Sequence, residues 1–400
     1  MPHPAVPAPA PAHPAWIEID LAALVHNARV LRRAIPAATR LGLLVKANAY
    51  GHGMLASARA AVAGGADQLI VASADEAFAL RGAGIRAPIL VVYGVRPDAV
   101  GPAADHHVEL SAGGTGSLQR TLAAWRAHRA GAASAARLRL HLEVDSGMGR
   151  GGIRPEELDA AVRAVDAEPG VELVAIWSHL ADGTDRERSA EQVRRYEDAL
   201  AGLARTGRAL PARHLAATEG LFAGTAPPYE MVRIGLGWYG ELGLGVAPTP
   251  ELADIAAELR PAMRVVAHPV RLETVPAGSS VGYGGEWTAP RPSRIATLPI
   301  GYADGWSRRS WPGGTALAGG RRVPIVGRVS MDSVCVDVTD VEGIGMDDEV
   351  VLLGTQGDER IGASEVAALR GTIPNEVMAT LGARLPRVLI GPDELDAASA

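Results

Sequence analysis

Eight short apolar runs between residues 41 and 234 place the strongest constraint on the fold of this chain. Most of them are separated by stretches with helical polarity, such as Thr115–Ala127, Pro155–Asp166 and Ser189–Arg205. Eight alternating strand and helix units in about 200 residues predict a (β/α)8 barrel. The expected strands are Leu41–Val45, Gln68–Ala72, Ile89–Tyr93, His107–Leu110, Leu138–Val144, Leu173–Ser178, Ala212–Ala216 and Met231–Ile234.

The pattern changes after about residue 250, where Val-, Ile- and Leu-rich runs are separated by Gly and Pro. Such closely spaced runs predict a mostly antiparallel β domain, with one late helix over Gly362–Leu369. We therefore expect a disordered Pro/Ala tail over residues 1–15, the barrel over 16–255 and the β domain over 256–400. The expected strands of the β domain are Ala262–Glu273, Ser293–Ile300, Arg322–Val329, Val334–Val338 and Glu349–Gly354.

Composition excludes several classes of protein. A net charge of −6 argues against nucleic acid or a membrane surface as the main partner, since both favour basic patches. The single cysteine, Cys335, excludes an internal disulfide and fits a reducing compartment, so we expect a cytoplasmic protein. The Pro/Ala-rich start lacks the charged and apolar regions of a signal peptide or a membrane span. No metal site is expected.

The run Val45–Gly53 (VKANAYGHG) carries the most informative chemical group. Lys46 directly follows the first expected strand, and reactive groups of such barrels gather at the carboxyl ends of the strands. A lysine there can form a Schiff base with a carbonyl compound, which is the chemistry that holds pyridoxal 5'-phosphate (PLP). Taken alone, this run is equally compatible with an ordinary surface lysine beside a turn.

Further polar groups follow other expected strands. Arg150 lies after the fifth strand, His179 after the sixth, Thr218 after the seventh and Arg233 near the end of the eighth. We expect them to converge with Lys46 on one face of the barrel. A lone histidine after an apolar strand is more often structural, whereas its place in this group favours a role near a cofactor ring.

Arg233 constrains the chemistry further. Arginine has donors but no acceptor and stays protonated, so it can donate to an unprotonated pyridine nitrogen. An arginine that faces this nitrogen makes the pyridine ring of PLP a weaker electron sink and so favours proton exchange over transamination or elimination. In the run Ile234–Gly237 (IGLG), backbone N–H groups of Gly235 and Leu236 can approach a phosphate, and Tyr50 can add a hydroxyl.

These segments, together with later ones in the same order, resemble the alanine racemase family from Trp16 to Val388. The resemblance implies a PLP-dependent enzyme that interconverts L- and D-alanine with two bases. Lys46 would serve one face of the α-carbon, and Tyr283, in the run Ser280–Gly285, would serve the other. In that family the tyrosine reaches the active site of the partner subunit, which implies an obligate head-to-tail homodimer.

The resemblance also implies the roles of individual residues. Tyr302 would gate the entry channel, the backbone amide of Met331 would bind the substrate carboxylate, and Asp332 would orient catalytic groups. Arg150 and Asn375 would contact both cofactor and substrate. The complete cofactor set would be Lys46, Tyr50, Arg150, His179, Thr218, Arg233, Gly235, Leu236 and Asn375.

Two positions depart from the family. Many members carry a carbamylated lysine seven residues before the arginine that is Arg150 here, whereas this chain has Glu143, whose carboxylate needs no CO₂. Asn375 occupies a position that usually holds tyrosine, so the substrate pocket should be wider and more polar. The same replacement is seen in the branch that racemises serine. Alanine therefore stays the first expected substrate, with serine as the second.

Two related classes of PLP protein remain as alternatives. The single-barrel PLP-binding proteins lack a β domain. The decarboxylases of basic amino acids share the architecture, yet they use an acidic group at the pyridine nitrogen and lack the second-base tyrosine. The family resemblance of this chain implies that Arg233 faces that nitrogen, so Arg233 and Tyr283 favour a racemase over both.

Overall fold

The computed structural model describes residues 12–131 and 135–391, which form two compact units. One unit is Leu21–Arg260, and the other joins residues 12–20 to Pro261–Gly391. The chain therefore passes from one unit to the other twice. The tail predicted over residues 1–15 falls largely on residues 1–11, which lie outside the described part of the chain.

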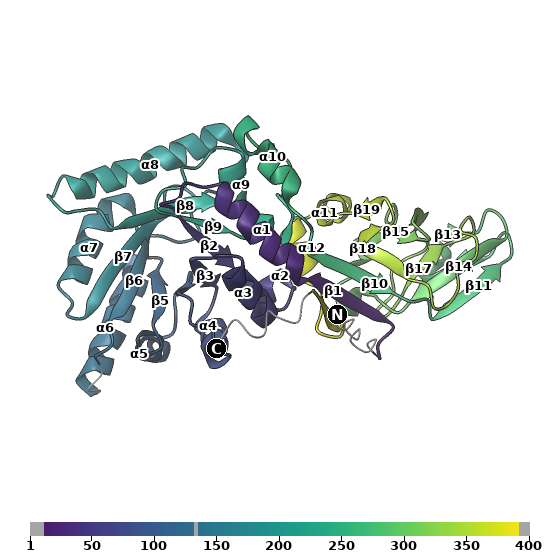
Figure 1. Cartoon of the computed structure of the whole chain (residues 1–400), viewed down its shortest axis with the longest axis horizontal. Coiled ribbons are helices and arrows are strands. Elements are labelled where there is room, and N and C mark those ends of the chain that lie inside the picture. The colour runs from purple at the N-terminus through teal and green to yellow at the C-terminus, as the bar shows by residue number, and fades with distance from the viewer. Residues whose placement is uncertain (1–11, 132–134, 392–400) are drawn as a thin grey trace, which may run out of the picture. The chain divides into compact units, whose positions relative to one another are not determined.

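The first unit is built on a closed barrel of eight parallel strands, β2 to β9, which confirms the predicted fold class (Figure 1). Strand β2 pairs with both β3 and β9, and this pairing closes the barrel. All eight predicted strands are present with small differences at their ends. The strands are β2 (Arg40–Leu44), β3 (Gln68–Val71), β4 (Ile89–Val91), β5 (Val108–Ala112), β6 (Leu138–Glu143), β7 (Val171–Trp177), β8 (Ala212–Ala217) and β9 (Met231–Ile234).

Helices follow the barrel strands, and most of them bury apolar residues against the barrel unit. In α7 (Leu158–Asp166) the buried residues recur at helical spacing, as expected for a helix that covers a sheet. Among the described residues, no helix is long and apolar enough to span a membrane. The other helical elements of this unit are α1 (Leu21–Arg33), α2 (Lys46–Tyr50), α3 (Met54–Ala63), α4 (Ala74–Gly82), α5 (Pro97–Asp105), α6 (Thr115–Gly131), η1 (Pro155–Glu157), α8 (Arg186–Ala204), α9 (Thr218–Phe222), η2 (Leu236–Tyr239) and α10 (Pro250–Glu258).

The second unit is rich in antiparallel strands, as predicted. Its largest sheet follows the path β16-β15-β18-β10-β1-β20, and β11-β14-β17 and β12-β13 form two smaller sheets. The strands are β1 (Ala15–Asp20), β10 (Met263–Ala267), β11 (Arg271–Val275), β12 (Ser280–Val281), β13 (Trp287–Thr288), β14 (Ser293–Leu298), β15 (Thr315–Ala318), β16 (Arg321–Pro324), β17 (Val334–Asp337), β18 (Val350–Gln356), β19 (Glu359–Ile361) and β20 (Arg387–Ile390). Its helical elements are η3 (Tyr283–Gly285), η4 (Tyr302–Asp304), η5 (Arg308–Ser310), α11 (Ala363–Arg370) and α12 (Pro374–Ala379).

The structure departs from the predictions in two boundaries and in one additional helix. Residues 16–20 belong to the β unit and not to the barrel, because β1 pairs antiparallel with β10 and parallel with β20. The single run predicted over Ala262–Glu273 is two strands, β10 and β11, separated by a stretch that contains Pro269, which has no N–H to donate. Helix α12 was not predicted, although Pro374 stands at its first turn.

Candidate active site

Lys46 opens an unusual turn directly after β2. The next four residues, Ala47 to Tyr50, have φ values between 52° and 54°, so the backbone is left-handed without a glycine. Left-handed helical conformation costs about 1–2 kcal/mol for each such residue. The turn is held by its own bonds and by Glu76, whose Oε1 accepts the Ala47 N–H at 2.7 Å. Backbone strain of this kind is characteristic of functional sites.

The amine of Lys46 lies among cationic and aromatic groups. Its Nζ is 5.8 Å from the ring centre of Tyr93, and Cζ of Arg150 lies 5.7 Å from the same ring. Burial lowers the pKa of Lys46, and the positive charges of Arg150 and Arg233 lower it further, against the opposing effect of Glu76. A lowered pKa leaves more of the amine neutral, which is the form that attacks a carbonyl or accepts a proton.

A cradle of hydroxyl groups and glycine backbone lies beside this lysine. Strands β2 and β9 are neighbours, with Leu43 opposite Ile234, so Lys46 and Gly235 follow adjacent strand ends. A Cβ atom at Gly235 would lie 2.7 Å from Oη of Tyr50, so the tyrosine hydroxyl rests directly against the glycine backbone. The Gly237 N–H donates to Oγ1 of Thr218 at 3.2 Å. The structure thus brings Tyr50, Thr218 and the Gly235-Leu236 turn together.

Arg233 is buried and strongly bonded at the end of β9. Its Nη1 donates to Nδ1 of His214 at 2.7 Å, and its Nη2 donates to Nδ1 of His179 at 3.1 Å. Carbonyl oxygens of Ser178 and Leu215 also accept from Nη2, at 2.9 and 3.1 Å. Burial lowers the pKa of Arg233 to about 10, so the guanidinium remains charged at neutral pH.

A chain of hydrogen bonds continues from Arg233 through the barrel interior. Nε2 of His214 lies 2.9 Å from Nδ1 of His141, and Nε2 of His141 lies 2.9 Å from Oε2 of Glu109. Arg233 can only donate, so Nδ1 of His214 accepts and its Nε2 carries the hydrogen. The same logic makes His141 donate to Glu109. One guanidinium therefore sets the tautomers of two buried histidines.

The charges along this chain are well defined. Burial lowers the pKa of both His141 and His214, so both rings are neutral. Burial by itself would raise the pKa of Glu109, yet hydrogen bonds from His141 and Gln68 and the charge of Arg139 hold it at about 2. A neutral pair of rings thus separates a buried cation from a buried anion. No prediction from the sequence included this hydrogen-bond chain.

His179 has a comparable environment on the other side of Arg233. Burial, and then the charge of Arg233, lowers its pKa to about 3, so the ring is neutral and its Nδ1 is an acceptor. The structure therefore joins two of the predicted site residues directly.

Arg150 and Glu143 lie on the β6 side of the rim. Arg150 is exposed, on a loop whose turn is fixed by Asp145, because Oδ1 of Asp145 accepts the N–H groups of Gly147 and Gly149. Burial raises the pKa of Glu143 against the lowering effect of Arg150. No hydrogen bond or ion pair joins the two side chains within residues 12–131 and 135–391. Glu143 therefore acts on Arg150 through charge at longer range.

Most of the site residues predicted in the β unit gather around the loop of residues 327–332. A Cβ atom at Gly327 would lie 2.4 Å from the Val281 carbonyl oxygen, so the Tyr283 turn packs against the start of this loop. The Tyr302 N–H donates to the Ser330 carbonyl at 3.0 Å, just before Met331. Tyr283, Tyr302 and Met331 are exposed by 67%, 39% and 52%.

Asp332 and Asn375 complete the predicted set. Asp332 closes the same loop of the β unit, and its Oδ1 accepts from Nη1 of Arg384 at 2.8 Å. Asn375 is partly buried on α12.

Both units match models of one protein family. Residues 19–243 match the description "Alanine racemase, N-terminal domain", and residues 262–389 match "Alanine racemase, C-terminal domain". The chain belongs to the alanine racemase family. This membership confirms the predicted family and the prediction of an amino-acid racemase.

Individual relatives agree along nearly the whole chain. The alanine racemase of Syntrophobacter fumaroxidans is 39% identical over 370 residues, which cover 92% of this chain and 95% of that protein. The alanine racemase of Sorangium cellulosum is 38% identical over 389 residues, covering 94% and 98%.

Two solved structures agree with the fold. The alanine racemase of D-cycloserine-producing Streptomyces lavendulae superposes with a TM-score of 0.85 at 34% identity, covering 96% of this chain and 99% of that one. The Bacillus anthracis alanine racemase with bound L-Ala-P gives a TM-score of 0.84 at 32% identity, covering 96% of both chains.

Proposed function

We propose that this racemase interconverts L- and D-alanine with pyridoxal phosphate as its cofactor. The observation that carries the proposal is the composition of one barrel rim. An amine of lowered pKa, a cradle of hydroxyl and glycine groups, and a buried guanidinium follow neighbouring strands.

The residues present fit this cofactor. Lys46 would bind its aldehyde carbon, and Tyr50, Thr218 and the backbone of Gly235-Leu236 would hold its phosphate. Arg233 would donate to the pyridine nitrogen. The four hydrogen bonds described above involve only Nη1 and Nη2, and Nε takes part in none of them. The bound cofactor would draw electrons from the α-carbon of the substrate and so acidify its proton.

Two bases would then exchange the α-proton on opposite faces. Lys46 Nζ would take or return the proton on one face, and its lowered pKa suits this task at neutral pH. Oη of Tyr283 of the partner subunit would serve the other face. Inversion requires this arrangement, because a single base on one face returns the proton to the side from which it came.

The exposure of the second base supports a shared site in a head-to-tail homodimer. Tyr283, Tyr302 and Met331 are large side chains that lie exposed around one loop of the β unit. Exposed apolar groups that cluster in this way mark surfaces for association. A second subunit would cover them and receive Tyr283.

Serine is a second candidate substrate because of Asn375. An amide at this position offers both a donor and an acceptor, whereas the tyrosine usual in the family fills the space with a ring. A serine hydroxyl in a closed apolar pocket would lose its hydrogen bonds, at a cost of about 1–3 kcal/mol. An amide beside the pocket removes part of this cost.

The decisive experiment exploits the fact that Lys46 is the only lysine in the chain. The loaded enzyme is reduced with borohydride, digested and mapped by mass spectrometry, while racemisation of L- and D-alanine is followed by chiral chromatography. We expect the cofactor on the peptide that contains Lys46, and Lys46→Ala should lose both the adduct and racemisation.

The controls separate binding from chemistry. The only other primary amine is the α-amine at the N-terminus, and its peptide provides an internal control for non-specific labelling. An adduct on the N-terminal peptide alone would contradict the role of Lys46. A Lys46 adduct without racemisation of any amino acid in a panel of L-isomers would contradict the proposed reaction.

A further inference from the structure

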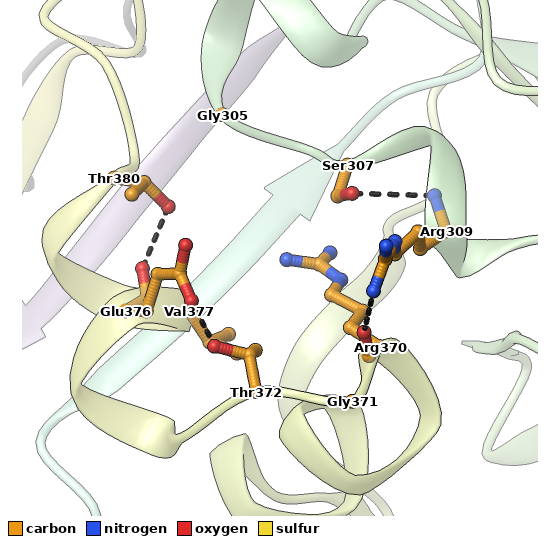
Figure 2. Close-up of a pocket in the computed structure, with 9 residues that line it drawn as sticks. All are labelled: Gly305, Ser307, Arg309, Arg370, Gly371, Thr372, Glu376, Val377 and Thr380. Carbon is orange, nitrogen blue, oxygen red and sulfur yellow. Dashed lines mark hydrogen bonds between the residues drawn. The ribbon is translucent and has the colours of Figure 1, made fainter.

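A cavity lies within the β unit, and no site residue proposed above lines it (Figure 2). Its volume is about 370 Å³, which is ample for a molecule the size of a small amino acid. Three short segments form its walls. The lining residues are Gly305, Ser307, Arg309, Arg370, Gly371, Thr372, Glu376, Val377 and Thr380.

Arg370 is the unusual member of this set. It is only 5% exposed, its Nε donates to Oγ of Ser310 at 3.1 Å, and its Cζ stacks 4.3 Å from the ring centre of Trp306. Nη2 is buried and has no hydrogen-bond partner among residues 12–131 and 135–391. A buried donor of a charged group without a partner costs free energy, so this guanidinium is incompletely satisfied.

The walls of the cavity carry opposite charges. Figure 2 shows the Arg370 guanidinium pointing into the cavity toward the side where Glu376 lies. Arg309 adds a second guanidinium beside it, with Nη1 donating to the Arg370 carbonyl at 3.2 Å. Oγ1 of Thr372 donates to the Glu376 carboxylate, which fixes its position. In the described part of the chain, no ion pair closes the gap between Arg370 and Glu376.

We propose that this cavity binds a free α-amino acid as a zwitterion. Its carboxylate would accept from Arg370 and Arg309, and its ammonium group would donate to Glu376. Bidentate donation by a guanidinium matches the geometry of a carboxylate. A plain anion would meet the repulsion of Glu376, and a plain cation would meet that of two arginines. Only a ligand with both charges complements both walls.

The position of the cavity gives the ligand a route to influence the enzyme. Glu376 is the neighbour of Asn375 on the short helix α12, and Asn375 does not line the cavity. A ligand held by Glu376 would therefore restrain the helix that carries the proposed specificity residue. This consequence rests on the proposed function, whereas binding itself does not.

The test is isothermal titration calorimetry on the cofactor-loaded enzyme with three probes: N-methylglycine, acetate and methylammonium. N-methylglycine keeps both charges, but its methylated nitrogen cannot form a neutral Schiff base at the active site. We expect it to bind at least about tenfold more tightly than either single-charge probe. Arg370→Met should weaken its binding at least about tenfold, and Glu376→Gln should reduce its affinity to that of acetate.

Controls keep the result interpretable. Arg163→Met on the exposed face of α7 removes one arginine without touching the cavity, so it should leave the titrations unchanged. If Arg370→Met does not fold, Glu376→Gln alone tests the inference, because Glu376 lies at the surface and its replacement should not disturb folding. Racemisation is assayed in parallel, so a failure of binding with intact racemisation contradicts this inference alone.

Three outcomes would overturn the inference. Equal affinity for acetate and N-methylglycine would make the cavity a plain anion site. Binding that neither Arg370→Met nor Glu376→Gln weakens would place the probe elsewhere, such as at the active site. Absence of binding would leave Arg370 and Glu376 as a structural pair bridged by solvent.

Discussion

Replacing Glu109 by glutamine tests the buried chain that ends at this carboxylate. Glu109 is about 4% exposed and accepts from His141 at 2.9 Å and from Gln68 at 2.6 Å. Glutamine keeps the shape and one acceptor oxygen but removes the charge. The pKa of Glu109 falls from 4.5 to about 2 in the folded protein, which corresponds to about 3 kcal/mol of stability, since each pKa unit is worth about 1.4 kcal/mol.

The expected readout is the melting temperature of the barrel unit at pH 7. For a unit of this size, about 3 kcal/mol corresponds to a fall of roughly 6–12 °C in melting temperature. The matched control is Glu172→Gln. Glu172 pairs with the same arginine, Arg139, at 2.9 Å, but its side chain is 37% exposed. A pair of this kind contributes about 0–1 kcal/mol, so the control should fall by no more than roughly 4 °C.

The pH dependence follows from the lowered pKa. A carboxyl group with a lowered folded-state pKa stabilises the fold above its unfolded value of about 4.5, and this contribution disappears as pH falls toward 2. The gap between the wild type and Glu109→Gln should therefore be constant above about pH 5.5 and narrow below about pH 4.5. Equal melting temperatures for Glu109→Gln and Glu172→Gln would refute the idea that the ionised Glu109 carboxylate stabilises the buried hydrogen-bond chain.

Three further predictions concern the reaction. Tyr283→Phe should lose most racemisation while keeping the cofactor on Lys46, and mixing it with Lys46→Ala subunits should restore part of the activity; mixed dimers without any activity would argue against a shared site. His214→Leu removes the acceptor that Nη1 of Arg233 contacts at 2.7 Å, so kcat should fall by about 10- to 100-fold while the cofactor is retained. An unchanged kcat would show that the hydrogen-bond chain has no part in the mechanism. Asn375→Tyr should lower kcat/KM for serine relative to alanine by about tenfold, as assayed by chiral chromatography, and an unchanged ratio would discard Asn375 as the specificity determinant.

The barrel could be predicted from the sequence because its strands are buried on both faces. Such strands form continuous apolar runs, and Leu41–Val45 and Ile89–Tyr93 are clear examples. The pairing of β1 could not be predicted in the same way. Its partners, β10 and β20, lie about 245 and 370 residues further along the chain, and local patterns carry no information about such distant pairing.

The buried hydrogen-bond chain of Glu109, His141 and His214 has a recognisable signal in the sequence, although it was not predicted. Each of these polar residues lies inside an expected barrel strand. A polar residue there has to find partners inside the barrel. Which residues meet depends on strand register and orientation, and both require the three-dimensional structure.

The local backbone conformation was the feature that the sequence predicted least well. Propensity gives no reason for Ala47 to Tyr50 to adopt left-handed backbone angles, since only surrounding contacts stabilise that conformation. Helix α12, in contrast, had a recognisable start. Proline is favoured in the first turn of a helix, and Pro374 occupies that position in α12. Asn375 follows it and therefore lies on the helix.

The distribution of cationic residues separates two kinds of chemistry in this chain. Lys46 is the only lysine among the 39 Lys and Arg residues, and all the others are arginines. A guanidinium stays protonated and pairs with carboxylates or phosphates, but it does not act as a nucleophile. Arg150 and Arg233 can therefore lower the pKa of Lys46 without competing with it for a carbonyl group. The sole lysine side chain therefore lies where burial and two positive charges favour its neutral form, against the opposing charge of Glu76, and the sequence contains no second lysine for the same role.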